Sequence, residues 1–174
     1  MKSIQRIIAL AVTSVFIVSP VFAQKPSSAP TPLQKVEYVL PYPGILPDHP
    51  LFVLKEFRDK ILDFLIVDPL RKAEFYVLQA DKRLGMGVML IDKGKSELAV
   101  QTIAQGEKYF TQVVTVFEGV KQSEKEMPSY ILERVIASMG KHEEVLTETL
   151  VKNSSVQSSL DLLKKTMEDI AKFR

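Results

Sequence analysis

The stretch "DPLRKAEFYVLQADKRLGMGVMLIDKGKSELAV", residues 68–100, decides the fold. Its apolar residues recur at alternating spacings of four and three, which places them on one stripe of an α-helix. The stripe consists of Leu70, Ala73, Val77, Ala80, Leu84, Gly87 and Ile91. A stripe of this kind is typical of a helix that packs along its whole length against another helix.

The ends of this helix have their own signals. Asp68 is suited to the N-cap, and Pro69 to the first helical position, where the missing N–H has no partner to lose. Gly94 ends the helix, and Ser96 is expected to cap the next one. Because the connection is so short, the two helices are predicted to run antiparallel, each about 37 Å long.

Four more stripes with helical spacing follow the same pattern, and no segment alternates apolar and polar residues as a strand would. They are Leu54, Phe57, Ile61 and Phe64; Ala99, Ile103, Gly106, Phe110, Val113, Phe117 and Val120; Leu132, Val135, Met139, His142 and Leu146; and Val156, Leu160, Leu163, Met167 and Ile170. The predicted fold class is all-α, an elongated bundle of about five amphipathic helices built on a long antiparallel helical hairpin. Whether the last two helices pack on this hairpin or on another chain is left open.

Two glycines lie on the stripes of the hairpin. Glycine inside a helix costs about 1 kcal/mol relative to alanine, so its presence needs a reason. We expect Gly87 and Gly106 to mark a close approach of the two backbones, or a kink, rather than a binding site.

The chain begins like a secretory signal peptide over residues 1–23. Lys2 and Arg6 precede an apolar run of residues 7–18, and a small-residue cleavage site ends at Ala23. Residues 24–41 are read as a Pro/Ser-rich spacer and 42–174 as the helical domain. We expect cleavage after Ala23 and a periplasmic or secreted protein without membrane insertion. An uncleaved signal that anchors the chain is the alternative.

Charge and cysteine content restrict the partners. The chain has 23 basic and 21 acidic residues, and loss of Lys2 and Arg6 with the signal would leave 21 of each. A neutral domain lacks the basic face that nucleic acid requires, so we expect no nucleic-acid partner. The chain has no cysteine, so core burial rather than disulfides must stabilise it. Protein partners are expected but not identified, and a homo-oligomer stays open.

The segment "YPGILPDHPLF", residues 42–52, connects spacer and bundle. Pro43 and Gly44 fit the centre of a tight turn. Asp48 is expected to cap the first helix by accepting the N–H of Leu51, and Pro50 to lie in the first helical turn.

The candidate catalytic and metal residues are few. His142 has neither a histidine four residues later nor a glutamate three residues before it, so it fits neither a metalloprotease nor a di-iron helix. We read it as a partly covered histidine at a helix edge. His49, beside Asp48, is likewise a weak metal ligand candidate. We therefore expect no enzyme activity, no metal and no cofactor.

The segments "PGILPDHPLFVLKEFRDKI" and "DPLRKAEFYVLQADKRLGMGVMLIDKGKSELA" resemble a family of exported bacterial and archaeal domains of unknown function. Members of that family combine a Pro-Gly-x-Leu-Pro-Asp-x-Pro-Leu entry motif with two antiparallel helices joined by a Lys-Gly turn. The resemblance covers residues 43–110, with Phe52 in place of the usual tyrosine. It implies an exported helical domain and lends neither an activity nor a catalytic residue.

Two functions from different classes follow from these observations. The first is an extracytoplasmic structural or protein-interaction module. The second is a periplasmic helical chaperone or envelope-stress sensor, in which Met86, Met89, Met127 and Met139 would help an apolar surface to adapt to varied clients. A contiguous exposed apolar patch well above about 600 Å² would favour binding of a client or a partner.

Overall fold

The structure is a computed structural model that describes residues 37–174. The predicted signal peptide 1–23 and most of the predicted spacer 24–41 lie outside the described residues. The helices are α1 (Phe52–Leu65), α2 (Pro69–Asp92), α3 (Ser96–Gln122), α4 (Ser129–Lys152) and α5 (Gln157–Ala171), with a 3-10 turn at Ser154–Val156. Residues 37–174 contain no strand, so the predicted all-α class is confirmed.

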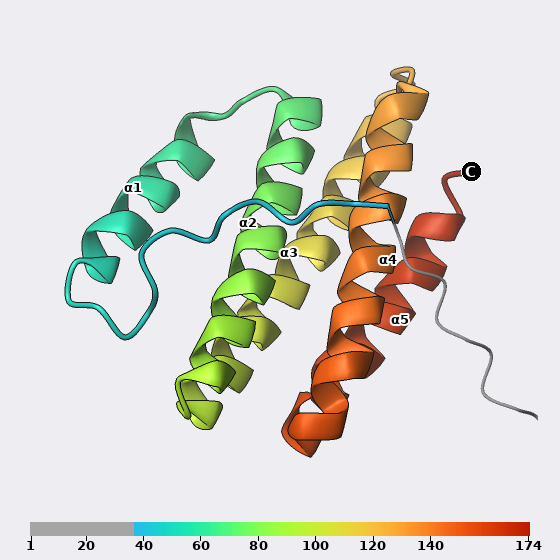
Figure 1. The fold of residues 1–174 in the computed structure, drawn as a ribbon. Helices are drawn as coiled ribbons and strands as arrows, with labels where there is room; N and C mark the ends of the chain where they lie inside the picture. Colours follow the sequence, from blue (N-terminus) through green and yellow to red (C-terminus); the bar gives the residue numbers. More distant parts are fainter. Residues whose placement is uncertain (1–36) are drawn as a thin grey trace, which may run out of the picture. The chain divides into compact units, whose positions relative to one another are not determined.

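Helices α2 and α3 form the predicted antiparallel hairpin (Figure 1). At its start the carboxylate of Asp68 accepts the N–H of Arg71 at 2.8 Å, with Pro69 as the first helical residue. At its turn Gly94 has a φ of 74°. The N–H groups of Gly94 and Lys95 donate to the carbonyls of Ile91 and Leu90, both at 2.8 Å. This Schellman motif pairs the last carbonyls of α2.

The prediction that Ser96 caps α3 is wrong. Ser96 is already the first residue of the helix, Lys95 occupies the N-cap position, and no side chain accepts a hydrogen bond there. The reason lies in the turn, because the second Schellman bond uses the N–H of Lys95 and leads the chain into α3 one residue early.

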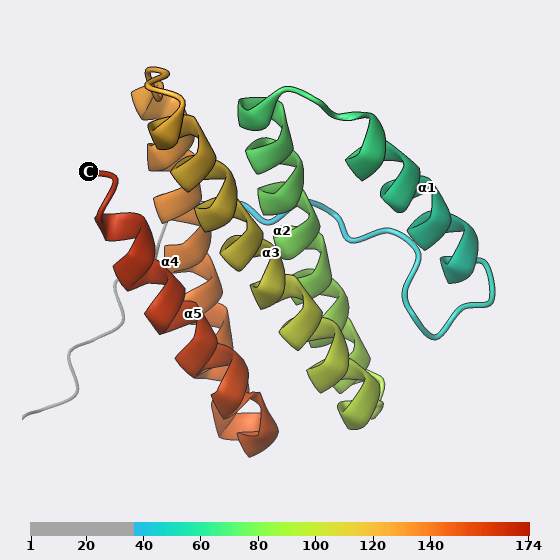
Figure 2. The ribbon, with the colours of Figure 1, turned by 180° about the vertical axis from the view of Figure 1, so that it is seen from behind.

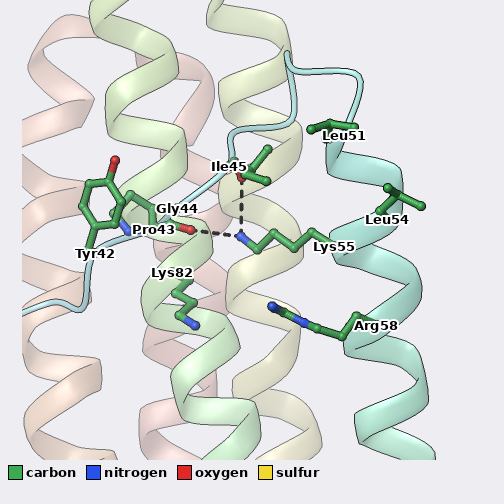
Figure 3. Close-up of a pocket in the computed structure, with 9 residues that line it drawn as sticks. All are labelled: Tyr42, Pro43, Gly44, Ile45, Leu51, Leu54, Lys55, Arg58 and Lys82. Atoms are coloured by element: carbon green, nitrogen blue, oxygen red, sulfur yellow. Dashed lines mark hydrogen bonds between the residues drawn. The ribbon is translucent and has the colours of Figure 1, made fainter.

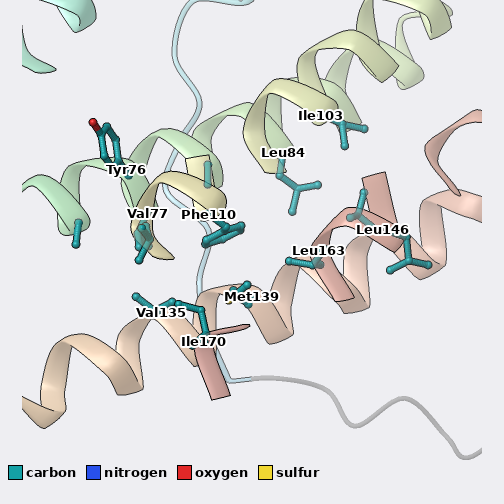
Figure 4. Close-up of a cluster of buried hydrophobic side chains, with 14 of the residues drawn as sticks. Tyr76, Val77, Leu84, Ile103, Phe110, Val135, Met139, Leu146, Leu163 and Ile170 are labelled. Carbon is teal, nitrogen blue, oxygen red and sulfur yellow. The ribbon is translucent and has the colours of Figure 1, made fainter. Parts of the chain in front are cut away.

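Helix α4 packs on α2, and α5 packs on both α3 and α4, so the last two helices close the bundle within one chain (Figure 2). The stripes predicted for α2 to α5 lie inside this bundle. Figure 4 shows Phe110, Leu84 and Ile103 of the hairpin facing Met139, Leu146 and Leu163 of α4 and α5. Helical periodicity therefore predicts the interior of these four helices correctly.

Gly87 and Gly106 mark the closest approaches between α2 and α3. A β-carbon at Gly87 would overlap the side chain of Ile103 and lie 3.2 Å from the carbonyl of Ala99. One at Gly106 would lie 3.1 Å from Cβ of Arg83 and 3.2 Å from the carbonyl of Ala80. Close backbone approach is the reason for both glycines, as expected from the sequence.

Residues 37–51 form an arm that crosses the bundle and then turns into α1 (Figure 1). Pro43 is buried against Gly85, and Leu46 is buried with Phe52 and Met86. Gly44 bends the arm with a φ of 76°. A hydrogen-bonded turn follows, in which the N–H of His49 donates to the carbonyl of Leu46 at 3.1 Å.

Asp48 does not cap α1, which corrects a second prediction. The N–H of Leu51 donates to Nδ1 of His49 at 3.1 Å, and the helix begins only at Phe52, after Pro50. The carboxylate of Asp48 instead accepts from the Lys93 and Lys95 ammonium groups, at 3.2 and 2.9 Å. Asp48 thus ties the arm to the α2–α3 turn rather than to its own helix.

Candidate functional site

Helix α1 lies beside the four-helix bundle rather than within it (Figures 1 and 2). Two of its acidic side chains are directed at α2. Glu56 forms an ion pair with Arg83 of α2 at 3.1 Å. Asp63 lies 3.6 Å from the ammonium of Lys72, also on α2. Polar contacts of this kind, together with the burial of Phe52, attach the helix to the bundle.

The apolar side chains of α1 consequently face outward. We call this surface the outer face; it consists of Val53, Leu54, Phe57, Ile61, Phe64 and Leu65. Phe57 is 64% exposed and Phe64 is 84% exposed. The stripe of Leu54, Phe57, Ile61 and Phe64 was expected to pack lengthwise against another helix, and within residues 37–174 it does not. The reason is that Glu56 and Asp63 of α1 have their ion-pair partners on α2, which turns the opposite side of the helix to solvent.

A pocket of about 470 Å³ lies where the arm meets α1 and α2. Figure 3 shows Arg58 of α1 and Lys82 of α2 extending toward the same space, beside Lys55. The remaining lining consists of Tyr42, Pro43, Gly44, Ile45, Leu51 and Leu54. The pocket therefore combines three cationic side chains with apolar walls, and Leu54 joins it to the outer face.

The side chain of Lys55 reaches from α1 across the pocket to the arm. Its ammonium donates to the carbonyl of Pro43 at 2.9 Å and lies 3.5 Å from that of Ile45. Burial lowers the pKa of Lys55 to about 8; the charge of Asp59 opposes this shift, and the charges of Lys82, Arg83 and Arg58 add to it. The charged form of Lys55 is thus solvated by backbone carbonyls rather than paired with a carboxylate.

The bundle interior holds a second unusual feature, a cluster of buried charges. His142 of α4 is fully buried between two carboxylates. Its Nδ1 lies 2.8 Å from Glu107 of α3 and its Nε2 lies 3.2 Å from Asp81 of α2. Asp81 also accepts hydrogen bonds from Ser138 at 2.5 Å and from Tyr38 of the arm at 2.7 Å. The cluster links three helices and the arm.

The two carboxylates keep His142 charged. Burial alone would lower its pKa, but the charge of Glu107 and hydrogen bonds to Asp81 and Glu107 outweigh that effect and raise the pKa to about 9. With both ring nitrogens bonded to carboxylates, the ring has no lone pair to offer a metal ion. Among residues 37–174, no group of three or more His, Cys, Asp or Glu is arranged to hold a metal.

The interpretation of His142 as a partly covered residue at a helix edge is therefore wrong. The sequence did contain a signal for the cluster. Asp81 lies four residues after Val77 and three before Leu84, and Glu107 lies in the corresponding register between Ile103 and Phe110. Asp81 and Glu107 thus lie directly beside the apolar stripes of two adjacent helices, where a carboxylate is buried and needs a cation, and His142 on the stripe of α4 supplies it.

Of the residues singled out from the sequence, the structure brings Pro43 and Gly44 into the pocket. Asp48 and Gly94 meet at the turn of the hairpin, through the lysines on either side of the glycine. Asp68 and Pro69 lie at the opposite end of α2. His49 is exposed, and Nδ1 of its ring accepts a hydrogen bond from the N–H of Leu51. Lys55, Arg58 and Lys82, which form the cationic part of the pocket, were not predicted.

The chain is thus an all-α protein with an antiparallel hairpin at its centre and an outward-facing amphipathic helix at its side. It belongs to a family defined as a domain of unknown function, DUF5667, which matches residues 44–170. No curated protein and no solved structure matches it. None of the helices in residues 37–174 is long and apolar enough to cross a membrane.

Proposed function

We propose that this chain is an exported protein-interaction module and that the outer face of α1 binds a protein partner. The observation that carries the proposal is the orientation of α1, which directs Glu56 and Asp63 toward its own bundle and the outer face, with Phe57 and Phe64, toward solvent. Export is supported by the signal-like residues 1–23 and by the resemblance of the Pro-Gly entry segment to exported domains.

The size of the outer face supports a binding role. An aromatic side chain contributes about 150–250 Å² when buried, so Phe57 and Phe64 alone expose about 300 Å². Val53, Leu54 and Leu65 are each more than half exposed and add to this area. The largest apolar patch of a typical monomer is about 300–600 Å², so the outer face is at or above the upper end of that range.

The surroundings of the outer face indicate the chemistry of the partner. Arg58 and Lys60 flank the apolar residues of α1, while the acids Glu56 and Asp63 are directed at the bundle. A partner with an apolar helix face and acidic residues along its edge would match this surface.

Site-directed photo-cross-linking in the producing cell tests the proposal. A photoreactive amino acid at Phe64 should give one discrete protein adduct, and the same residue at the exposed Lys165 of α5 should give none. The Phe64 adduct should disappear when Leu54→Asp places a charge on the outer face. Equal adducts at both positions would contradict the proposal. The amino-terminal sequence of the protein recovered from outside the cytoplasm tests the export part of the proposal. Retention of residues 1–23 would instead indicate an anchored form.

A chaperone function is the second candidate, and the same exposed apolar area favours it. Of the four methionines, Met86 and Met139 are buried and Met127 packs against the core, so only Met89, which is 36% exposed, could contribute to a client surface. A chaperone should suppress aggregation of a heat-unfolded substrate such as citrate synthase, and Phe57→Ser should reduce that effect. If the purified chain leaves aggregation unchanged, the chaperone function is excluded.

A further inference from the structure

The cationic pocket beside α1 has no acidic side chain in its lining. Lys55 is solvated by the carbonyl of Pro43, and Arg58 is paired with the neighbouring Asp59 at 2.6 Å while its side chain stays 60% exposed. Within residues 37–174, Lys82 has no ion-pair partner. Positive charge is therefore concentrated in a hollow where an anion would gain several favourable interactions at once.

The apolar part of the lining is continuous with the outer face. Leu51 and Leu54 are half or more exposed at the beginning of α1, and Ile45 and Tyr42 stand opposite them on the arm (Figure 3). A ligand that fills the pocket therefore meets cations on one side and apolar side chains on the other. This combination suits an anionic group attached to an apolar segment.

We propose that this pocket binds a carboxylate carried on an apolar segment of the protein that covers the outer face. The inference rests on the proposed function and specifies the chemistry of the partner at one point. Lys55, Arg58 and Lys82 surround the carboxylate, while Leu51 and Leu54 contact the apolar residues next to it. The carboxylate is an aspartate or glutamate side chain, or the carboxyl terminus of the partner chain.

A peptide fits this pocket better than a lipid surface does. Lys55 projects from the inward side of α1 toward the arm, where its ammonium reaches the carbonyl of Pro43. A flat bilayer that touches Phe57 and Phe64 on the opposite side of the helix would not reach that ammonium. A flexible peptide can follow the surface from Leu54 into the pocket.

The state of Lys55 also agrees with an anion site. Burial and neighbouring cations lower its pKa to about 8, so a bound carboxylate would stabilise the ammonium and raise that pKa. Lys55 can therefore be used to detect binding of an anion in the pocket by NMR. Its side-chain resonances follow both the occupancy of the pocket and its protonation.

The experiment uses the purified exported chain and N-acetyl-leucine, which carries one carboxylate and one apolar side chain. We expect saturable NMR shifts at the Lys55 and Lys82 side chains and a higher pH midpoint for Lys55. N-acetyl-leucinamide has the same apolar group without the charge and should cause neither change. Lys82→Gln or Arg58→Gln should weaken binding about fivefold, as expected for the loss of one nearby charge in water. Lys165→Gln, at an exposed position of α5 outside the pocket lining, is the control and should bind normally.

Three results would overturn the proposal. The first is the absence of a saturable shift at Lys55. The second is an equal response to inorganic phosphate, which would show that the apolar contact is irrelevant. The third is binding to phosphatidylglycerol vesicles that depends on Lys82 and prevents N-acetyl-leucine binding, which would make the ligand a lipid. A chain that keeps its Phe64 cross-link but fails the NMR test would disprove the pocket proposal alone.

Discussion

Raising the pH from 6 to 9 should lower the free energy of unfolding by about 3 kcal/mol through His142 alone. The folded protein holds the His142 proton up to a pKa of about 9, whereas an unperturbed histidine releases it near 6.5. Between these pH values the folded state binds more protons than the unfolded state. The stabilisation is therefore complete below pH 6.5 and is lost as the pH rises through 9, at about 1.4 kcal/mol for each pH unit.

The groups around the ring of His142 determine how far its pKa is raised. Glu107 and Asp81 contact its two nitrogens, Ser138 and Tyr38 donate to Asp81, and Phe110 lies edge-on at 4.8 Å between ring centroids. Tyr38 has a pKa raised by burial and by Asp81, so it titrates only above the chosen range.

The assay is urea unfolding followed by circular dichroism at several pH values between 6 and 9. Lys55 has the opposite effect on the free energy of unfolding. Its pKa is lower in the folded state than in the unfolded state, so above pH 8 the stability contributed by Lys55 rises with pH. His142→Gln keeps Lys55 but cannot titrate, so the difference between the two chains isolates His142.

Two results would refute the reasoning. One is a wild-type stability that stays constant or increases from pH 6 to 8. The other is an equal pH dependence in His142→Gln. That variant leaves two buried carboxylates without a cation, a loss of about 3–5 kcal/mol, and so it could unfold. Direct NMR titration of the His142 ring in the unaltered chain then decides, because a midpoint at or below 6.5 contradicts the charged cluster.

Three substitutions and one control substitution test the backbone and the arm. Gly87→Ala should lower stability by about 1–2 kcal/mol in thermal or urea unfolding, because its methyl group would overlap the buried Ile103 side chain. Gly85→Ala is its control and should raise stability by up to about 1 kcal/mol through helix propensity; an equal loss in both would contradict the close-approach interpretation. Glu124 follows α3 in a left-handed conformation, with a φ of 52°. Glu124→Gly should therefore raise the free energy of unfolding by a few tenths to about 1 kcal/mol, and a lower stability of the variant would contradict this interpretation. Asp48→Ala should lower the thermal midpoint at low salt but barely at 1 M NaCl, since Asp48 pairs with two surface lysines; a salt-independent loss would argue for another role.

The periodicity of apolar residues predicts the bundle well because α2 to α5 follow one rule, that apolar residues spaced by three and four are buried. In α2 to α5 the apolar residues that are spaced by three and four are the residues that pack, and the turn at Gly94 determines the direction of α3. Hydrophobic burial dominates these helices, so a pattern that reports hydrophobicity is sufficient for them.

The same rule fails for α1 and for His142, for different reasons. The stripe of α1 shows which residues share a face, but it does not show whether that face has a partner in the same chain. The ion pairs of Glu56 with Arg83 and Asp63 with Lys72 decide the orientation, and they join residues distant in sequence. The environment of His142 depends on Glu107 and Asp81, which are 35 and 61 residues away in the sequence. Their register indicates that they are buried, but it does not indicate which side chain they meet.

The buried charges also bear on how the bundle finds a single arrangement. Apolar stripes are tolerant, since leucine or valine meets another apolar residue after a helix slides by one turn. A slide of α4 by one turn would separate His142 from Asp81 and Glu107 and leave two carboxylates uncompensated in the interior. We expect the cluster to fix the register of α2, α3 and α4 relative to one another. In that case positions 81, 107 and 142 should change together among family members and rarely one at a time.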